Sequence, residues 1–326
     1  MKILVAGGAG YLGSVLIPRL LERGYSVDVV ELFWFGNHLP GEVGILNKDL
    51  FDLTVEDLRA YEHVIFLAGL SNDPMAEFSP SKNFIFNAAA PAYLAYISKR
   101  ALVRRFIYAS SCSVYGYTED ELYDETRPAV SSYPYGISKL QGEQAALQLV
   151  SREFSVISLR KGTVSGYSPR MRLDLVINTM FKTALKDETI TVNNPSIWRP
   201  ILDIEDAANA YIRAVEAGQS ISGIFNVASG NHTVGEIADL VKKTVEQELQ
   251  LRVGLVILDK QDFRNYKVSI GKAENILSFH PQGNVRSITL KLIENLAKFN
   301  DWDNPAYYNI ETLKKLEALS VGGAAS

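Results

Sequence analysis

Short runs of hydrophobic residues alternate with longer segments of helical periodicity through the first half of the chain. Uninterrupted apolar runs of this kind are typical of strands in a parallel sheet whose two faces are both covered. The pattern predicts strands at residues 2–6, 27–31, 44–47, 64–67, 105–109 and 156–159. It predicts helices between them at residues 11–23, 83–101 and 135–153. Repeated strand–helix–strand units predict an α/β fold with a doubly wound parallel sheet, the Rossmann arrangement.

The pattern changes after Gly162, where the elements become shorter and prolines interrupt the chain. We expect residues 1–162 to form the Rossmann domain and residues 163–320 to form mainly a smaller C-terminal α/β lobe. The chain is expected to return to the first domain near residues 199–228, and residues 321–326 are expected to be a disordered tail. Further helices are predicted at residues 174–186, 234–249, 288–297 and 310–319.

Pro18 conflicts with the first predicted helix, because a proline inside a helix removes a backbone hydrogen bond and costs about 3 kcal/mol. The apolar spacing nevertheless continues through Leu20 and Leu21. We therefore expect one helix with a bend near Ser14.

Glycines follow the first predicted strand at the spacing of a dinucleotide-binding turn. Glycine lets the backbone turn tightly and approach phosphates without a Cβ in the way. The helix that follows directs its free N–H groups and the positive end of its dipole at a bound anion. The motif predicts a site for a dinucleotide pyrophosphate; a glycine-rich turn without a ligand is the alternative. The residues of this turn that we expect to contact the cofactor are Gly7, Gly10, Tyr11, Leu12 and Gly13.

Glu31, at the end of the second predicted strand, favours NAD over NADP as the cofactor. A carboxylate in this position accepts hydrogen bonds from the adenosine ribose and repels the 2′-phosphate of NADP. Residues 32–35 contain no arginine that would bind that phosphate. Asp49 and Leu50 follow the third predicted strand, where Asp49 is expected to accept a hydrogen bond from the adenine amine. A solvated surface acid is the alternative for both carboxylates.

Tyr135 and Lys139 are candidate catalytic residues, because their spacing places them on one face of a helix. A free tyrosine has a pKa of about 10, and a neighbouring ammonium and a cationic nicotinamide ring would lower it. Lys139 is also expected to hold the nicotinamide ribose. Ser111 lies in a serine-rich segment at the end of a predicted core strand, where ligands bind in parallel sheets. We expect Ser111 to hydrogen-bond the substrate oxygen that exchanges a proton with Tyr135.

Composition and charge argue against several other classes of protein. Hydrophobic residues make up 47% and charged residues 21%, and the net charge of −4 gives no indication of a nucleic-acid partner. The single cysteine, Cys112, excludes an intrachain disulfide, and the four histidines have no metal-ligand spacing. No apolar run reaches membrane-spanning length, and Met1 leads directly into a strand rather than a signal peptide. We expect a cytoplasmic protein with no metal, membrane or nucleic-acid partner.

Together, these motifs resemble the extended short-chain dehydrogenase/reductases, in particular the nucleotide-sugar epimerase/dehydratase group. The resemblance covers residues 2–298 and places the family's catalytic residues at Ser111, Tyr135 and Lys139. It implies NAD as the cofactor and a nucleotide-diphosphate sugar as the substrate, bound mainly by the C-terminal lobe. It also assigns a signature after the fourth strand and a helical asparagine to the cofactor site, namely Leu67, Ala68, Gly69 and Asn87.

The resemblance implies a reaction in which NAD takes hydride from a sugar carbon, usually C4, while Tyr135 takes the hydroxyl proton. Reduction of the resulting 4-keto sugar on its other face gives an epimerase, which is the function we expect. A dehydratase or a 4-ketoreductase on the same class of substrate is the first alternative. A non-catalytic dinucleotide sensor is a remote one, because such proteins typically lose the tyrosine or the lysine.

The substrate residues follow from the same resemblance. Arg199 and Arg264 are expected to bind the diphosphate, because planar guanidinium groups suit phosphate oxygens, and the arginines of residues 170–172 are the alternative. Asn72 is expected to face the substrate or to cap the next turn. The full set of other residues expected to contact substrate is Ser71, Asn72, Ser111, Cys112, Ser113 and Thr163.

Several positions depart from the family pattern. Cys112 and Ser113 stand where the family's 4,6-dehydratases carry acid–base carboxylates, which disfavours elimination of water. Cys112 is expected to pack in the core, with a role as general acid as the alternative. Asp203 replaces a frequent histidine and Thr163 an asparagine that contacts the diphosphate. The residues therefore do not identify the nucleotide or the sugar.

The helices at residues 83–101 and 134–150 have alanine-rich and aliphatic faces. In similar proteins the equivalent pair forms a four-helix dimer interface. We therefore expect a homodimer.

Overall fold

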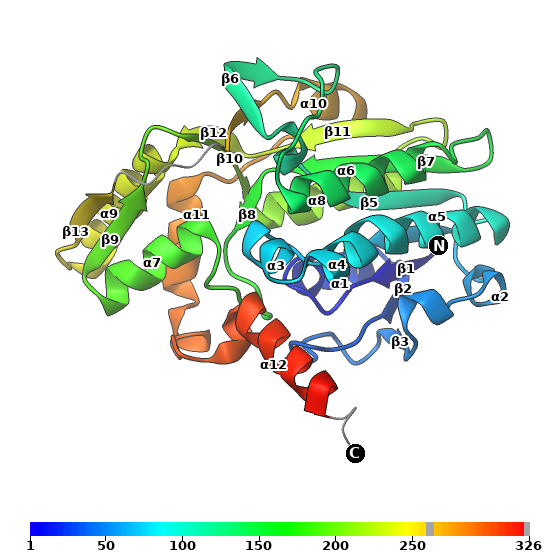
Figure 1. The fold of residues 1–326 in the computed structure, drawn as a ribbon, viewed down its shortest axis with the longest axis horizontal. Coiled ribbons are helices and arrows are strands. Elements are labelled where there is room, and N and C mark those ends of the chain that lie inside the picture. The colour runs from blue at the N-terminus through cyan, green and yellow to red at the C-terminus, as the bar shows by residue number, and fades with distance from the viewer. Residues whose placement is uncertain (259–263, 323–326) are drawn as a thin grey trace.

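The computed structural model, which describes residues 1–258 and 264–322, is built on a parallel sheet of seven strands (Figure 1). The strand order is β11-β7-β5-β4-β1-β2-β3, and every neighbouring pair is parallel. The chain starts at β1, winds outward to β3, and then crosses back to β4 on the other side of β1, which confirms the doubly wound α/β fold. The strands are β1 (Lys2–Ala6), β2 (Ser26–Val30), β3 (Gly44–Leu46), β4 (His63–Phe66), β5 (Arg105–Ser111), β7 (Ser155–Lys161) and β11 (Gly223–Val227).

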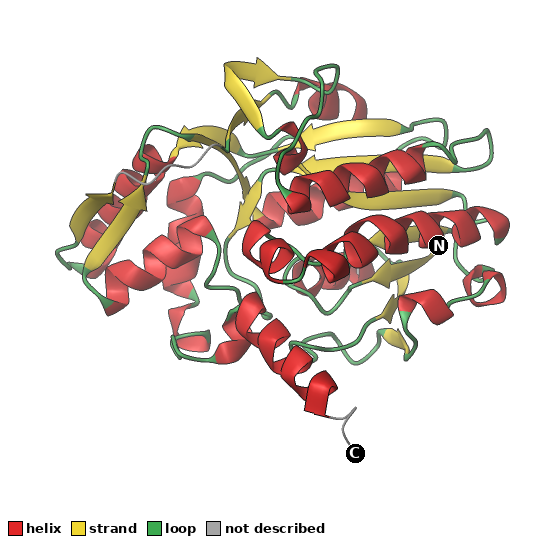
Figure 2. Ribbon diagram, in the orientation of Figure 1, coloured by secondary structure: helices red, strands yellow, loops and turns green. Residues whose placement is uncertain are grey.

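Helices cover both faces of this sheet (Figure 2). Side chains of β1 point alternately into two hydrophobic clusters, Ile3 and Val5 into one, Leu4 and Ala6 into the other. α1 and α8 contribute to the first cluster, α5 and α6 to the second. No helix within the described residues is long and apolar enough to cross a membrane. The four covering helices are α1 (Gly13–Glu22), α5 (Ala90–Arg100), α6 (Pro134–Leu147) and α8 (Ile204–Glu216).

The helix predicted to begin at residue 83 starts earlier and is interrupted. α4 (Pro80–Phe84) and α5 are joined by the π-helical turn η2 (Ile85–Ala89). Pro91 has no N–H to donate to the carbonyl of Asn87, and the Tyr108 hydroxyl donates to that carbonyl instead, at 2.9 Å. The proline therefore explains the change in the hydrogen-bond ladder, which the hydrophobic pattern did not reveal.

Two other predicted helices also differ at their ends. Pro18 lies inside α1, and the helix continues past it to Glu22. α6 ends at Leu147, well before the predicted end at residue 153, because the chain must turn before β7 begins at Ser155.

The C-terminal lobe contains smaller sheets and a group of helices. β12, β10 and β8 form one sheet, β13 pairs with β9, and β14 pairs with β6. Between β10 and β12 the chain passes through α8 and β11, which belong to the main sheet layers. The remaining strands are β6 (Tyr117–Tyr123), β8 (Thr163–Ser165), β9 (Thr189–Asn193), β10 (Trp198–Asp203), β12 (Gly230–Thr233), β13 (Gly254–Leu258) and β14 (Asn265–Val268). The remaining helices are α2 (Val55–Leu58), α3 (Asp73–Phe78), α7 (Val176–Lys186), α9 (Val234–Leu249), α10 (Gly271–Leu277), α11 (Val285–Glu294) and α12 (Asn309–Gly322).

The last helix corrects one prediction. Val321 and Gly322, which we expected in a disordered tail, belong to α12, and residues 323–326 lie outside the described residues. α12 packs against α3, where Leu313 joins Leu70 and Met75 in a small hydrophobic cluster.

A buried ion pair fixes α6 to the sheet. Arg160 of β7 donates to Glu143 of α6 with an Nη2–Oε1 distance of 2.5 Å, and both side chains are almost completely buried. Ser158 donates a second hydrogen bond to Glu143 at 2.9 Å, and Arg160 also donates to the hydroxyl of Tyr115 at 2.9 Å. Because α6 also carries Tyr135, this pair determines where that side chain lies relative to the strand ends.

Replacing one partner should leave the other charge buried without compensation. We expect Glu143→Gln to lower the free energy of unfolding by about 3 kcal/mol, measured by urea denaturation. Glu56→Gln is the matched control, because Glu56 pairs with Arg59 on the surface, and it should cost less than about 1 kcal/mol. Equal losses in the two variants would contradict this account of α6.

Candidate functional site

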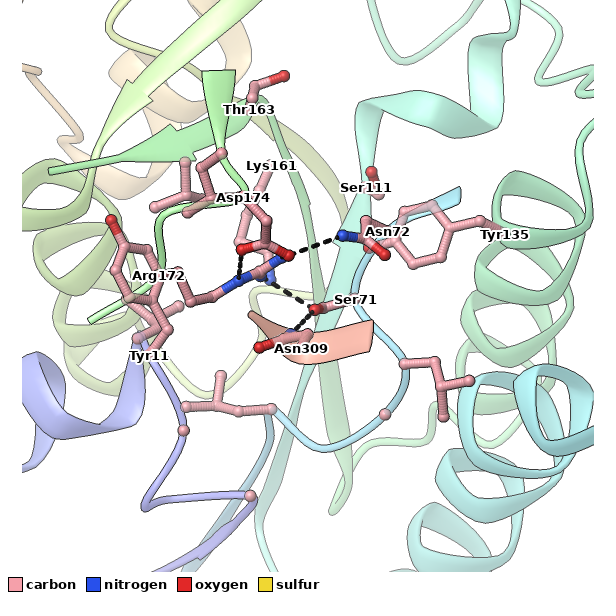
Figure 3. Close-up of a pocket in the computed structure, with 18 of the residues that line it drawn as sticks. Tyr11, Ser71, Asn72, Ser111, Tyr135, Lys161, Thr163, Arg172, Asp174 and Asn309 are labelled. Carbon is pink, nitrogen blue, oxygen red and sulfur yellow. Dashed lines mark hydrogen bonds and ion pairs between the residues drawn. The ribbon is translucent and has the colours of Figure 1, made fainter. Parts of the chain in front are cut away.

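A cavity of about 690 Å³ lies between the carboxyl edge of the sheet and the C-terminal lobe. Residues from the loops after β1, β2, β4 and β5 line one side, and residues near β8 and β10 line the other (Figure 3). The structure therefore brings most of the predicted site residues to one cavity. Those that line it are Gly7, Gly10, Tyr11, Leu12, Gly13, Glu31, Asp49, Leu50, Leu67, Ala68, Gly69, Ser71, Asn72, Ser111, Ser113, Tyr135, Thr163, Arg199 and Arg264.

The glycine loop after β1 has a shape that side chains would prevent. Gly7 has φ of +80°, and a Cβ there would lie 2.5 Å from the backbone nitrogen of Ala68. A Cβ on Gly13, the first residue of α1, would lie 2.0 Å from the carbonyl oxygen of Gly8. At Gly10 a Cβ would meet only the carbonyl of Gly7, at 3.2 Å. Gly7 and Gly13 are therefore needed for the shape of the turn, whereas the absence of a side chain at Gly10 leaves space in the cavity.

Glu31 joins the end of β2 to this loop. Its carboxylate accepts hydrogen bonds from the backbone N–H groups of Ala9 at 3.1 Å, Leu32 at 2.9 Å and Phe33 at 3.3 Å. Burial raises the pKa of Glu31, and these hydrogen bonds act in the opposite direction. The carboxylate is therefore a fixed part of the cavity wall rather than a solvated surface acid.

Asp49 has a local structural role in the free chain. It caps the short helix η1 (Leu50–Asp52) by accepting a hydrogen bond from the N–H of Phe51 at 2.9 Å. This cap holds Asp49 and Leu50 at the cavity wall.

Tyr135 and Ser111 both line the cavity, and Ser111 lies close enough to the phenol to act on its pKa. Ser113 donates a hydrogen bond to the hydroxyl of Ser111 at 2.8 Å, so the two serines and the phenol form a continuous polar group. We expected a neighbouring ammonium to lower the pKa of Tyr135, but in the chain alone its pKa is raised, because burial outweighs the lowering effect of Ser111.

Lys139 lies behind the cavity wall. Its Nζ is 5.9 Å from the centre of the Tyr135 ring and 5.4 Å from that of Tyr108. The side chain is buried and does not line the cavity, and burial together with the charge of Lys161 lowers its pKa. In the free chain Lys139 thus lies behind Tyr135, and its contact with the nicotinamide ribose stays a prediction.

Cys112 and Asn87 were expected at the site but lie outside it. The Cys112 thiol is fully buried and donates to the carbonyl of Arg160 at 3.1 Å, and burial raises its pKa. The Cys112 side chain packs in the core and points away from the cavity edge.

Asn87 donates to the carbonyl of Leu70 at 2.8 Å, and its Oδ1 occupies the space beside Gly69 where a Cβ would lie. Asn87 therefore shapes the loop after β4 and does not line the cavity.

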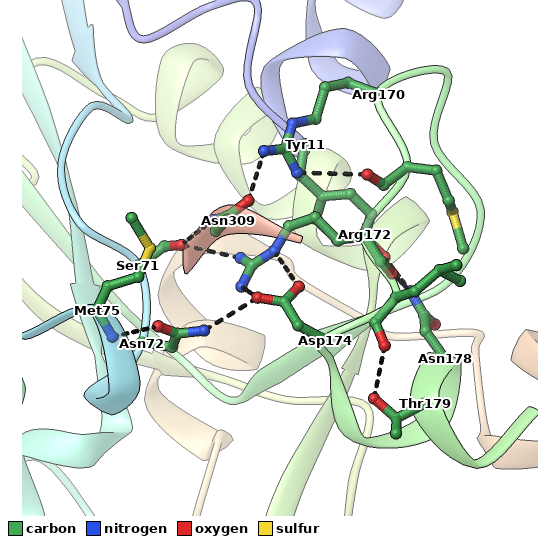
Figure 4. Close-up of polar contacts among 12 residues, drawn as sticks. Tyr11, Ser71, Asn72, Met75, Arg170, Arg172, Asp174, Asn178, Thr179 and Asn309 are labelled. Carbon is green, nitrogen blue, oxygen red and sulfur yellow. Dashed lines mark hydrogen bonds and ion pairs between the residues drawn. The ribbon is translucent and has the colours of Figure 1, made fainter. Parts of the chain in front are cut away.

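A network of hydrogen bonds joins side chains that line the cavity, and the sequence motifs did not identify it (Figure 4). Arg172 makes two hydrogen bonds of 2.9 Å to Asp174 and a third, of 3.0 Å, to Ser71. Asn72 donates to Asp174 at 3.1 Å, and Asn309 of α12 donates to Ser71 at 2.8 Å. These residues come from three segments far apart in the chain, so no local spacing could have predicted their contact.

Two further arginines extend the site. Arg170 donates to Asn309 at 2.5 Å, and its guanidinium stacks on Phe35 at 3.7 Å from the ring centre. Arg264 forms an ion pair of 2.7 Å with Asp73, and Arg199 donates a hydrogen bond to the backbone carbonyl of Arg264. The expected arginines and their alternatives in residues 170–172 thus all line the same cavity.

A family model described as the NAD dependent epimerase/dehydratase family matches residues 3–228. The chain belongs to this family. The match confirms the resemblance found in the motifs and identifies the protein as an enzyme of a family that acts on nucleotide sugars with NAD.

Individual relatives of this NAD-dependent epimerase/dehydratase are distant. The putative UDP-arabinose 4-epimerase 4 of Arabidopsis thaliana is 27% identical over 286 residues, which is 76% of this chain and 66% of that protein. The UDP-glucuronic acid decarboxylase 3 of the same plant is 26% identical over 305 residues, covering 88% and 86% of the two chains. The structure of MoeE5 in complex with UDP-glucuronic acid and NAD superposes with a TM-score of 0.80 at 26% identity, over 91% of this chain and 99% of that one.

The residues at the amino-terminal side of the cavity fit the cofactor of the family. The glycine loop is open only at Gly10, and α1 begins directly behind it, so the positive end of the helix dipole lies at the space that a pyrophosphate needs. Glu31 and Asp49 lie at the ends of β2 and β3, where the adenosine end would lie.

Gly10→Ala tests this fit. The added methyl group would stand in the cavity, and we expect NAD affinity, measured by calorimetric titration, to fall by at least about tenfold, or about 1.4 kcal/mol. Gly41→Ala is the control, because a Cβ at Gly41 meets nothing within 4 Å and lies away from the cavity. Both variants should keep the melting temperature of the parent within a few degrees. Unchanged affinity in Gly10→Ala would show that the pyrophosphate does not approach this loop.

Proposed function

We propose that this enzyme is an NAD-dependent epimerase of nucleotide-diphosphate sugars, acting through a transient 4-keto sugar. The placement of Tyr135 and Ser111 together at the cavity carries the proposal (Figure 3). A sugar hydroxyl bound against both groups would accept a hydrogen bond from Ser111 and face the phenol oxygen of Tyr135. This arrangement supports proton exchange between that hydroxyl and Tyr135.

The residues at the cavity have different roles in the proposed reaction. NAD, when bound, supplies the hydride acceptor and donor. Tyr135 exchanges the hydroxyl proton, and Ser111 fixes the position of the oxygen. The raised pKa of Tyr135 in the free chain means that the phenol becomes a base only when positive charge near its ring offsets burial. Lys139, 5.9 Å from the ring centre, is placed to provide such charge once it is protonated.

Arg199 and Arg264 are proposed to hold the diphosphate of the substrate. Both line the C-terminal-lobe side of the cavity, and Asp73 fixes Arg264 from the loop after β4. The ring of Tyr266 lies 5.5 Å from the Arg199 guanidinium and adds an aromatic surface. A diphosphate at this wall leaves the sugar between it and Tyr135.

Epimerisation is favoured over loss of water because the segment after Ser111 supplies no carboxylate. Cys112 is buried in the core, and Ser113 hydrogen-bonds Ser111.

A second candidate is decarboxylation of a nucleotide uronic acid, which is favoured by the similarity to the plant decarboxylase. A 4-ketoreductase would consume NADH in net turnover. A sensor without activity is disfavoured by the retention of both Tyr135 and Lys139.

Tyr135→Phe tests the catalytic assignment. We expect kcat to fall by about 10²-fold to 10⁴-fold with little change in NAD affinity, because only the proton-transferring oxygen is removed. NMR analysis of products from a panel of nucleotide sugars measures turnover and separates epimer, decarboxylated sugar, dehydrated sugar and reduced sugar. Tyr25→Phe, outside the cavity, should turn over like the parent. Full activity in Tyr135→Phe would refute the assignment.

We also propose that the enzyme is a homodimer formed through the helices α4 to α6. Apolar side chains on this segment are exposed in the single chain: Phe84 by 36%, Ile85 by 43% and Tyr96 by 49%. α5 and α6 pack side by side, so a second copy would complete a four-helix contact.

Light scattering on the purified protein should give a mass about twice the 36.1 kDa of the chain. Tyr96→Glu should shift the protein toward the monomer, because a charge would be buried in the contact. Ile276→Glu is the control, because Ile276 is similarly exposed, at 44%, but lies on α10. A parent protein that is monomeric at micromolar concentration would exclude the dimer.

A further inference from the structure

Lys161 is a cation at the reaction centre that no motif assigned. It is the last residue of β7, and in the parallel register with β5 it stands directly opposite Ser111. It lines the same cavity as Tyr135 and Thr163, and Figure 3 shows its side chain directed toward the middle of the cavity. A lysine in this position reaches the space where the substrate hydroxyl meets Ser111.

Three other cations that line the cavity are paired with carboxylates of the protein. Arg172 pairs with Asp174, Arg264 with Asp73, and Lys48 with Asp57. Lys161 differs from them: within the described parts of the chain no carboxylate lies within ion-pair distance of its Nζ, and no hydrogen bond is made there. The ring centre of Tyr211 lies 5.8 Å from Nζ.

The surroundings of Lys161 disfavour its charge. Burial is the main cause that lowers its pKa to about 8; the Arg172 guanidinium acts in the same direction and the thiol of Cys112 in the opposite one. A buried ammonium without an opposite charge costs free energy, which an anionic ligand group would offset. The protein thus retains a cation in its cavity that only a ligand can pair.

The position of Lys161 on the sheet indicates which anionic group of a ligand it would bind. β7 is three strands from β1, a separation of about 14 Å, so the lysine is far from the glycine loop and its pyrophosphate site. It is one strand, about 4.8 Å, from β5 and Ser111. The anion must therefore belong to the part of the substrate that reacts, the sugar ring.

We propose that Lys161 binds a carboxylate on the sugar ring, so that the enzyme acts on nucleotide-linked uronic acids in preference to neutral sugars. This rests on the proposed function, because it assigns the substrate class of the same cavity. Lys161 is then the residue that determines specificity, while Tyr135 and Ser111 act on the hydroxyl.

UDP-glucuronic acid and UDP-glucose are the matched probes, since they differ only in a carboxylate against a hydroxymethyl group. The NAD-loaded parent should favour the acid by at least about tenfold in kcat/KM and in Kd, about 1.4 kcal/mol. Lys161→Gln should bring the ratio of the two sugars to near one, and Lys161→Arg, which keeps the charge, should retain a preference for the acid. Lys186→Gln, on the exposed face of α7, is the control and should keep the parent ratio.

A second readout reports the charge itself. Pairing with a carboxylate raises the pKa of a lysine, so the parent should take up protons on binding the acid at pH 8, measured by calorimetry in buffers of different ionisation enthalpy. Lys161→Gln should not, and UDP-glucose should cause no uptake in either protein. A parent that prefers UDP-glucose, or an unchanged ratio in Lys161→Gln, would overturn the role of Lys161 and leave the proposed function standing. Failure to bind either nucleotide sugar would overturn the proposed function and this proposal with it.

Discussion

The parallel register of the central sheet decides where chemistry can take place in this protein. The strands β1, β4, β5 and β7 all run in one direction, so their carboxyl ends meet at a single edge. The register brings the ends of these strands to one cavity. It is lined by Gly7, which follows β1, and by Ser111 and Lys161, which are the last residues of β5 and β7. A shift of one residue in the pairing of β5 with β7 would turn Ser111 and Lys161 to opposite sides of the sheet.

A second constraint is the way the C-terminal lobe is held against this edge. Arg172 and Asp174 lie on the lobe, and their hydrogen bonds to Ser71 and Asn72 reach the loop after β4. Asn309, at the start of α12, joins the same network from the end of the chain. Each of these buried polar groups needs its partner, since an unpaired one costs about 1–3 kcal/mol. The network therefore favours one relative position of lobe and sheet, in which the cavity has its present shape.

The elements of the fold that could be predicted were those with a local signal. The glycine turn, the buried strands and the Tyr135–Lys139 pair are all encoded within a few adjacent residues. The π-helical turn before Pro91 was missed because hydrophobic periodicity does not register one displaced hydrogen bond.

The parts of the site that were missed depend on long-range contacts. Asn309 reaches Ser71 across 238 positions of sequence, and no spacing rule connects them. Cys112 follows Ser111 in the chain but points into the core, since the backbone leaves β5 in a short 3-10 turn after the serine. Adjacency in the sequence therefore overstated its role, and only the path of the chain could have corrected it.

Burial acts on the titratable groups of the reaction centre in opposite directions. It raises the pKa of Tyr135 and lowers the pKa values of Lys139 and Lys161, so desolvation acts against the charged form of all three. The protonation of these groups therefore responds to the charge that ligands bring. A cationic ring favours the phenolate of Tyr135, and a carboxylate favours the ammonium of Lys161. Desolvation thus makes the protonation states of Tyr135 and Lys161 depend on the charges of the ligands that bind beside them.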